Sequence, residues 1–224
     1  MTWFRCTGGS GSPVPAAENL IYNFGSAGFN TGHNHTANTK IVFKAMLTDM
    51  AAFGGYGQAF GARNANKNNN AFGLFHRFNG ARKYCFYRTG YEIQGDVAGT
   101  TGSTTAPFSN EVCIFTAEGN SISWYKENAQ SDVHQLSAPS ATVNDGICPL
   151  AIFCCNTSNQ QDGWSATDYG MMRLYWFEIY ESNVLVHRFV PAYHNDQYCL
   201  YDEIEQDYIY DVVNNGLYLS GVVS

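Results

Sequence analysis

The sequence has little charge. Only 14% of its 224 residues are Asp, Glu, Lys or Arg, whereas 45% are hydrophobic and 15% are aromatic. Disordered chains show the opposite balance, so this composition excludes disorder. Nowhere do apolar residues keep the spacing of an amphipathic helix over a long stretch. The chain therefore has enough hydrophobic residues for a packed core but lacks the periodicity expected of a helical protein.

Positive charge is the scarcer sign. Lys and Arg number 12 against 19 Asp and Glu, which gives a formal net charge of −7 and an isoelectric point near 5.2. An acidic surface repels phosphate backbones and no basic stripe offsets it, so we expect no nucleic-acid partner. No apolar run approaches the length of a membrane span, and we expect no membrane insertion. The sequence begins without the basic and apolar segments of a signal peptide, which predicts synthesis in the cytoplasm.

Motifs of metal and nucleophile sites are missing too. The number of cysteines, seven, is odd and none has C-x-x-C spacing, so we predict buried thiols and no zinc site. The sequence has no Gly-x-Ser-x-Gly elbow, and the glycines at 8–11 lack the Lys-Ser/Thr of a phosphate loop. Asp162 and Asp168 offer oxygen ligands for calcium, but no spacing signature supports such a site. We therefore expect no cofactor.

The chain does contain short β-like runs separated by turn residues. β-Branched and aromatic residues dominate 40–47, 71–78, 83–88, 111–117, 121–126, 171–180, 183–190 and 208–213. Asn79-Gly80 and the segment 118–120 are hairpin signals. The apolar run 148–155 is typical of a central strand buried on both faces. These patterns predict an all-β fold, a two-sheet antiparallel sandwich whose core includes Ile152, Phe153, Phe177 and Ile179.

The first twenty residues differ from the rest. Residues 7–18 are rich in Gly, Ser, Pro and Ala, and they separate an apolar tip, Trp3 and Phe4, from the body. We divide the chain into an extended N-terminal arm, 1–20, and one β-sandwich domain, 21–224. Each large aromatic contributes about 2 kcal/mol when buried. Ordering a dozen residues costs more than that, so we expect the arm to contact another chain in a homo-oligomer or larger assembly.

The most specific pattern lies in the last third of the chain. It consists of a strand-like run, a short turn, a second run that ends in proline, and a Leu-Tyr-Asp triplet. Its residues are Arg173, Tyr175, Phe177, Ile179, Tyr180, Leu185, Val186, Phe189, Pro191, Leu200, Tyr201 and Asp202. With Gln58-Ala-Phe-Gly-Ala-Arg63 upstream, this pattern resembles the concanavalin A-like (laminin-G-like) jelly rolls of tail, fibre and other virion proteins of phages and prophages. The resemblance implies a virion location, other virion subunits as partners, and host glycans as a ligand class.

A fold alone does not carry an activity, so three functions stay open. They are a non-enzymatic virion structural protein, a glycan hydrolase on the same fold, and a free lectin-like binding module. Retaining glycosidases need two carboxylates about 5–5.5 Å apart. Glu178 and Glu181 fall on opposite faces of a strand, and Glu203 and Glu205 lie in a polar connection where carboxylates are normally solvated. We therefore expect that the protein is not an enzyme.

Two details of the strands follow from spacing. Strict alternation places Leu174, Trp176, Glu178 and Tyr180 on one face, and Tyr175, Phe177 and Ile179 on the other. Pro191 has no amide hydrogen, which predicts that the second run ends there.

Ligand contact is expected at the long loop 156–170, where Trp164 and Tyr169 lie near Asn159 and Asp162. Aromatic rings stack on the CH faces of sugars, while amides and carboxylates pair with hydroxyl groups. The alternative is that Trp164 only fills the end of the sandwich.

The histidines suggest no site by themselves. His33 and His35 share one face of an extended segment, but two imidazoles without a third ligand are an incomplete metal site. We interpret that segment as a polar loop, and His187 and His194 as isolated edge or loop residues.

Overall fold

The protein is described by a computed structural model, which covers residues 21–23, 27–47, 56–63, 70–78, 82–88, 91–96, 111–137, 144–160, 163–170, 172–212 and 217–218. The arm 1–20 with Trp3 and Phe4 lies outside these residues, and so does Asp162. Among the described residues no helix is long and apolar enough to cross a membrane.

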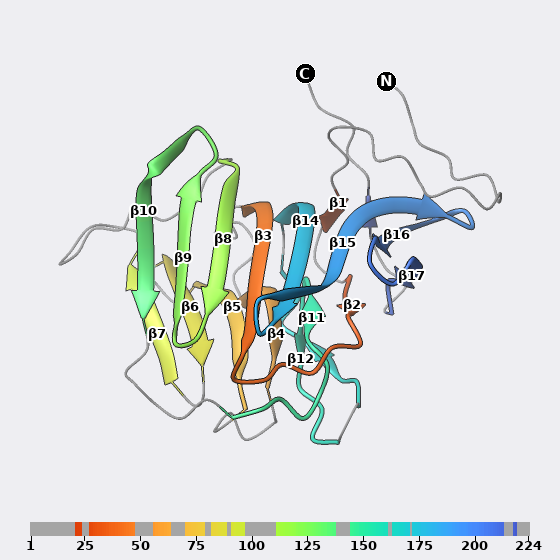
Figure 1. The fold of residues 1–224 in the computed structure, drawn as a ribbon, viewed down its shortest axis with the longest axis horizontal. Coiled ribbons are helices and arrows are strands. Elements are labelled where there is room, and N and C mark those ends of the chain that lie inside the picture. Colours follow the sequence, from red (N-terminus) through yellow and green to blue (C-terminus); the bar gives the residue numbers. More distant parts are fainter. Residues whose placement is uncertain are drawn as a thin grey trace.

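Two sheets face each other (Figure 1). The first sheet has the order β10 (Ala129–Ser137), β9 (Ser121–Lys126), β8 (Cys113–Glu118), β3 (Thr39–Leu47), β14 (Met172–Glu181), β15 (Val184–His194), β16 (Gln197–Asp202) and β17 (Asp207–Tyr210). β1 (Ile21–Asn23) also pairs with β14, and β18 (Leu217–Tyr218) pairs with β1.

The second sheet has the order β13 (Ala166–Thr167), β12 (Cys155–Asn156), β4 (Tyr56–Ala62), β5 (Phe72–Phe78), β6 (Arg82–Arg88) and β7 (Tyr91–Asp96), with β11 (Ala151–Ile152) beside β4 and β2 (Phe29–Asn30) beside β11. The chain passes from β3 to the second sheet, returns for β8–β10, crosses again for β11–β13 and returns at β14. Nearly all pairs are antiparallel, so the expected all-β, two-sheet jelly roll is confirmed.

The core lies between the sheets and is rich in phenylalanine. β3 buries every second residue, as expected of a strand with one face on a core. The ring of Phe43 stacks on Phe115 of the same sheet at 4.6 Å and meets Phe60 of the opposite sheet edge-on at 5.7 Å. Such ring pairs add about 0.5–1.5 kcal/mol each beyond their buried area. The predicted core residues are fully buried: Ile152, Phe153, Phe177 and Ile179.

The apolar run 148–155 is buried throughout, but the prediction of one continuous strand is wrong. Phe153 has a left-handed backbone, with φ of 67°, a rare conformation for a bulky residue. Its N–H donates to Ala59 O, and its carbonyl accepts from Gly170 N–H. The chain turns there, so that β11 runs antiparallel to β4 while β12 runs parallel to it.

The predicted alternation along β14 is also wrong at one point. The pairing with β3 shifts by one residue between Leu174 and Trp176, which is a β-bulge. As a result, Leu174 joins Phe177 and Ile179 in the core. Trp176 instead packs on a second, smaller cluster on the outer face, made of Val190, Ala192, Cys199 and Tyr201.

Pro191 does not end its strand, contrary to the expectation. β15 continues to His194, and Pro191 pairs with Leu200 of β16. Beyond Phe189 the pairing of β15 with β14 has ended, so among the described strands β15 has a neighbour on one side only. A proline whose nitrogen faces such an open side removes no ladder hydrogen bond. Figure 1 shows β15 curving away from the sheet toward its C-terminal end, with β16 and β17 beside it.

Cysteine behaves as predicted in the described part of the chain. Five thiols are free and buried there: Cys113, Cys148, Cys154, Cys155 and Cys199. Burial raises the pKa of the Cys148 thiol to about 11 and that of Cys155 to about 12. These thiols stay protonated at neutral pH and are poor nucleophiles and metal ligands.

Candidate functional site

The loop that follows β12 is built around one buried amide. Asn156 is fully buried, and its Nδ2 donates to Pro149 O at 3.0 Å and to Gly163 O at 2.9 Å. Its Oδ1 accepts from the N–H groups of Ser158 and Ser165, at 3.2 and 3.0 Å. All of the hydrogen-bonding capacity of this amide is used. Asn156 therefore fixes both ends of the segment 157–165.

This loop carries the residues predicted to contact a ligand. Asn159 is exposed, and Trp164 and Tyr169 are half-buried. Trp164 lies beside Gly28, because a side chain at that glycine would come within 3.8 Å of its ring. Burial raises the pKa of Tyr169, and the nearby Cys154 and Asp211 raise it further. Trp164 and Tyr169 thus both have Cys154 in their surroundings.

Of the two acidic residues of the loop, the structure describes only Asp168. Asp168 forms an ion pair with Arg63, with Nη2 and Oδ2 2.7 Å apart, and Asp162 lies outside the described residues. In the described part of the chain, no group of three or more His, Cys, Asp or Glu side chains is placed to hold a metal ion.

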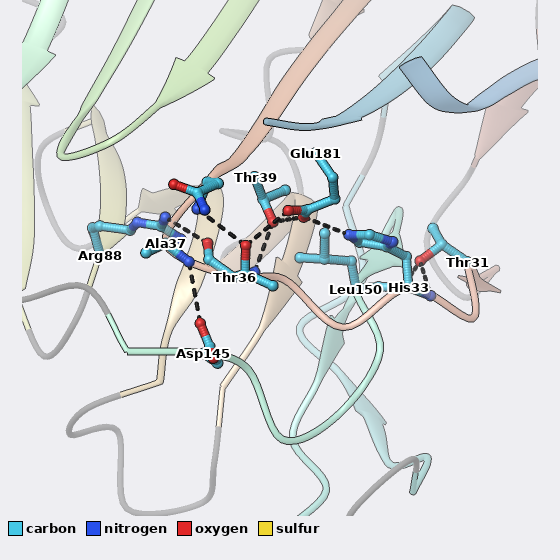
Figure 2. A network of polar contacts seen from close by, with 10 residues as sticks. Thr31, His33, Thr36, Ala37, Thr39, Arg88, Asp145, Leu150 and Glu181 are labelled. Atoms are coloured by element: carbon cyan, nitrogen blue, oxygen red, sulfur yellow. Dashed lines mark hydrogen bonds and ion pairs between the residues drawn. The ribbon is translucent and has the colours of Figure 1, made fainter. Parts of the chain in front are cut away.

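A second polar cluster lies where the loop 31–38 meets the end of β14 (Figure 2). The carboxylate of Glu181 accepts hydrogen bonds from the hydroxyls of Thr36 and Thr39, and His33 Nε2 lies 2.9 Å from its Oε1. Burial alone would raise the pKa of Glu181, but these hydrogen bonds outweigh it and lower the pKa. Glu181 is therefore a charged, partnered group rather than a solvated turn carboxylate.

His187 and Asp202 extend this cluster on the neighbouring strands. His187 Nδ1 is 2.6 Å from Asp202 Oδ2, and Asp202 Oδ1 accepts from the N–H groups of Arg188 and Ile204. The rings of His33 and His187 meet edge-on with centroids 5.4 Å apart. Two imidazoles thus face each other, and each is held by its own carboxylate.

Beneath them, two basic side chains are fully buried. Neither ring nitrogen of His35 has a hydrogen-bond partner among the described residues. Arg88 crosses from β6 to donate to Gly119 O and Thr36 O, while its Nη1 has no partner there (Figure 2). Its guanidinium lies over the ring of Phe72 at 4.0 Å, a cation–π contact that offsets part of its burial. Burial lowers the pKa of Arg88 to about 10, so it remains charged.

The carboxylates expected to be inactive in hydrolysis are separated as predicted. Glu178 lies on the outer face, where Tyr180 donates to it at 2.8 Å and Arg188 at 2.9 Å. Glu181 points to the other face, beside Thr39. Glu203 pairs with Arg188 in the turn after β16, and Glu205 is exposed.

The sequence did not reveal the histidine cluster. The segment 31–38 is a loop, as predicted, but His35 is buried and His33 is joined to Glu181. His187, interpreted as isolated, is paired with Asp202. Glu181 and Asp202 are the last residues of β14 and β16, which flank β15. Sequence spacing cannot show which loop crosses there.

Comparison with known proteins adds little to this picture. No family model matches the chain. No curated protein matches it in sequence. Among solved structures, the mouse laminin alpha1 chain, domains LG4-5, is similar over 78% of this chain and 45% of that chain, with 14% identity and a TM-score of 0.41. This chain thus spans less than half the length of that protein.

Proposed function

We propose that this chain is a non-catalytic binding domain of a phage or prophage virion, in a fibre, a tail or the capsid surface. In this proposal its jelly roll docks to other virion subunits, to host glycans, or to both. The virion setting is supported by the resemblance of the segment 173–202 to jelly rolls of such particles. The arm 1–20 would add contacts to other subunits in a homo-oligomer.

The observation that supports binding best is the loop held by Asn156. A loop fixed at both ends loses little conformational entropy when a ligand arrives. It presents the exposed Asn159 and the half-buried rings of Trp164 and Tyr169. Apolar ring faces with amides beside them suit sugars, which have CH faces and hydroxyl groups.

The glycan hydrolase alternative has less support. Glu178 and Glu181 occupy opposite faces of β14, and hydroxyl, imidazole or guanidinium groups engage both. A retaining mechanism needs two carboxylates about 5–5.5 Å apart on either side of one bond. Because Glu178 and Glu181 cannot flank one glycosidic bond from opposite faces of a strand, we favour a binding function over hydrolysis.

The test compares two half-buried tryptophans. Trp164→Ala should abolish binding on a glycan array and to host cells, with a small loss of stability. Trp176→Ala is the matched control, because Trp176 is also half-buried but packs on the outer-face cluster. Trp176→Ala should lower the melting temperature and leave binding unchanged.

Two outcomes would contradict the proposal. If Trp164→Ala binds as well as the unchanged protein and only its melting temperature falls, the ring merely fills the end of the sandwich.

Mass spectrometry of purified particles tests the virion setting separately. A chain missing from every particle while it still binds glycans would be a free lectin-like module.

A further inference from the structure

Three histidines, His33, His35 and His187, lie close together in the structure. His33 and His35 lie on the loop 31–38, and His187 lies on β15. This loop joins β2 of the second sheet to β3 of the first, so it ties the two sheets together. It is also hydrogen-bonded to the segment 144–150: Gly146 N–H donates to His35 O at 2.6 Å, and Leu150 N–H donates to His33 O at 2.8 Å.

His35 is the unusual member of the group. Its ring packs on Phe72 with centroids 5.4 Å apart, and a side chain at Gly146 would come within 2.5 Å of its Nδ1. The ring is fully buried, and neither nitrogen has a partner among the described residues. Burying an unpaired polar group is unfavourable, and burying a charged one is far more so. The closed loop therefore accommodates this ring only in its neutral form.

We propose that the loop 31–38 and the segment 144–150 form an acid-operated latch, which is closed while His35 and His33 are neutral and opens when they bind protons. Opening precedes separation of the two sheets, because both histidines lie on the loop itself. The open latch uncovers the end of the core at Phe72 and Arg88.

The charges around the latch explain why it cannot stay closed in acid. Among the described residues, Arg88 faces it from β6, Asp145 from the segment 144–150, Glu181 from β14, and the His187–Asp202 pair from β15 and β16. Glu181 is bound to His33 and Asp202 to His187, and no carboxylate in the described part of the chain hydrogen-bonds to His35. A proton on His35 would therefore meet the charge of Arg88 with no counter-ion in contact.

The size of the effect follows from linkage. Burial, and then the charges of Arg88 and His33, lower the pKa of His35 from 6.5 to about 3. Because the open form regains the ordinary pKa, the opening constant rises as the pH falls below 6.5, by up to about tenfold per pH unit, until the pH nears 3. Burial lowers the pKa of His33 as well, which acts in the same direction. Hydrogen bonds to Glu181 and Asp202 outweigh their burial and lower their pKa values, so both carboxylates stay ionised over most of this range.

Hydrogen exchange of the full-length protein between pH 7.5 and 4.5 tests the latch. After correction for intrinsic exchange at each pH, the opening constant reported by the amides of Gly146 and Leu150 should rise about 100-fold from pH 7.5 to 4.5, with most of the rise below pH 6.5. Amides at the centre of β3 should keep their protection. In His35→Phe and His35→Leu the rise should largely disappear, leaving the smaller part due to His33.

His134→Phe is the matched control. His134 also stacks on an aromatic ring, that of Trp124, but lies on the edge strand β10. This variant should keep the full pH dependence of the latch. The proposal is overturned if His35→Leu keeps the 100-fold rise, or if the β3 amides lose protection together with Gly146. It is also overturned if the His35 ring of the unchanged protein titrates near pH 6.5 while the latch amides stay protected.

Discussion

Two segments at the same end of the sandwich bury polar side chains in opposite ways. Asn156 is fully buried and makes four hydrogen bonds, two as donor and two as acceptor. His35 is equally buried and makes none among the described residues. A satisfied buried amide fixes its loop in one conformation, whereas an unsatisfied imidazole stabilises nothing by hydrogen bonding. The first arrangement is suited to holding its loop in place, and the second to opening.

The comparison predicts its largest effect at Asn156. Asn156→Ala leaves the carbonyls of Pro149 and Gly163 and the N–H groups of Ser158 and Ser165 without partners. We expect the free energy of unfolding to fall by about 3–4 kcal/mol, because Asn156 itself is fully buried and its partners Pro149 and Ser158 are buried as well, so the groups left unpaired there are costly. Urea denaturation at pH 7 measures this. A decrease in the free energy of unfolding of less than about 1 kcal/mol would mean that water replaces the hydrogen bonds of the Asn156 amide. The proposed difference between Asn156 and His35 would then be wrong.

A smaller effect is expected where the latch is packed most tightly. Gly146→Ala adds a methyl group 2.5 Å from His35 Nδ1, closer than real side-chain contacts. Overpacking of this kind should cost about 1–3 kcal/mol and weaken the hydrogen bond from Gly146 to His35 O. In a double-mutant cycle, His35→Ala should remove most of that cost. If Gly146→Ala lowers the free energy of unfolding equally in the presence and absence of the His35 ring, the added methyl group does not clash with that ring.

The smallest effect is expected at His35 itself. His35→Leu keeps an apolar contact with Phe72 and removes two unpartnered nitrogens. At pH 7.5 stability should change by about 1 kcal/mol or less, in either direction, because no hydrogen bond is lost. At pH 4.5 the variant should exceed the unchanged protein, which by then has lost about 2.7 kcal/mol from two pH units of linkage. The pH dependence of urea midpoints measures both values.

The sign of that pH effect follows from proton counts. Between pH 6.5 and about 3 the unfolded chain binds a proton at His35 that the folded protein does not bind. Stability therefore falls as the pH falls through this window. Replacing the ring with leucine removes the difference, so the variant and the unchanged protein should diverge only below pH 6.5.

The local residue pattern was enough to predict several elements. The β-branched and aromatic run 40–47 became β3, because alternation on a half-buried strand needs no information from elsewhere. The hairpin signal at 118–120 became the turn between β8 and β9, where Gly119 adopts a positive φ of 53°. The burial of 148–155 was also predictable, because an apolar run of that length has no polar face to expose.

Other features depended on what lies next to each strand. The bulge at Leu174–Trp176 arises from the register with β3, and it moved Leu174 into the core against simple alternation. Pro191 was tolerated because β14 no longer pairs with β15 at that point. The turn at Phe153 depends on bonds to Ala59 and Gly170, which are distant in sequence.

The sequence by itself determined the fold class, the burial of its apolar runs and the separation of Glu178 from Glu181, since these depend on composition and on the two-residue period of a strand. Only the tertiary structure decided which polar groups meet. His33 and Glu181 are 148 residues apart, and Asn156 and Arg88 take partners from different loops. Hydrogen bonds and burial depend on three-dimensional proximity. The sequence therefore predicts His35 as a polar loop residue, whereas in the fold its ring is buried and has no hydrogen-bond partner among the described residues.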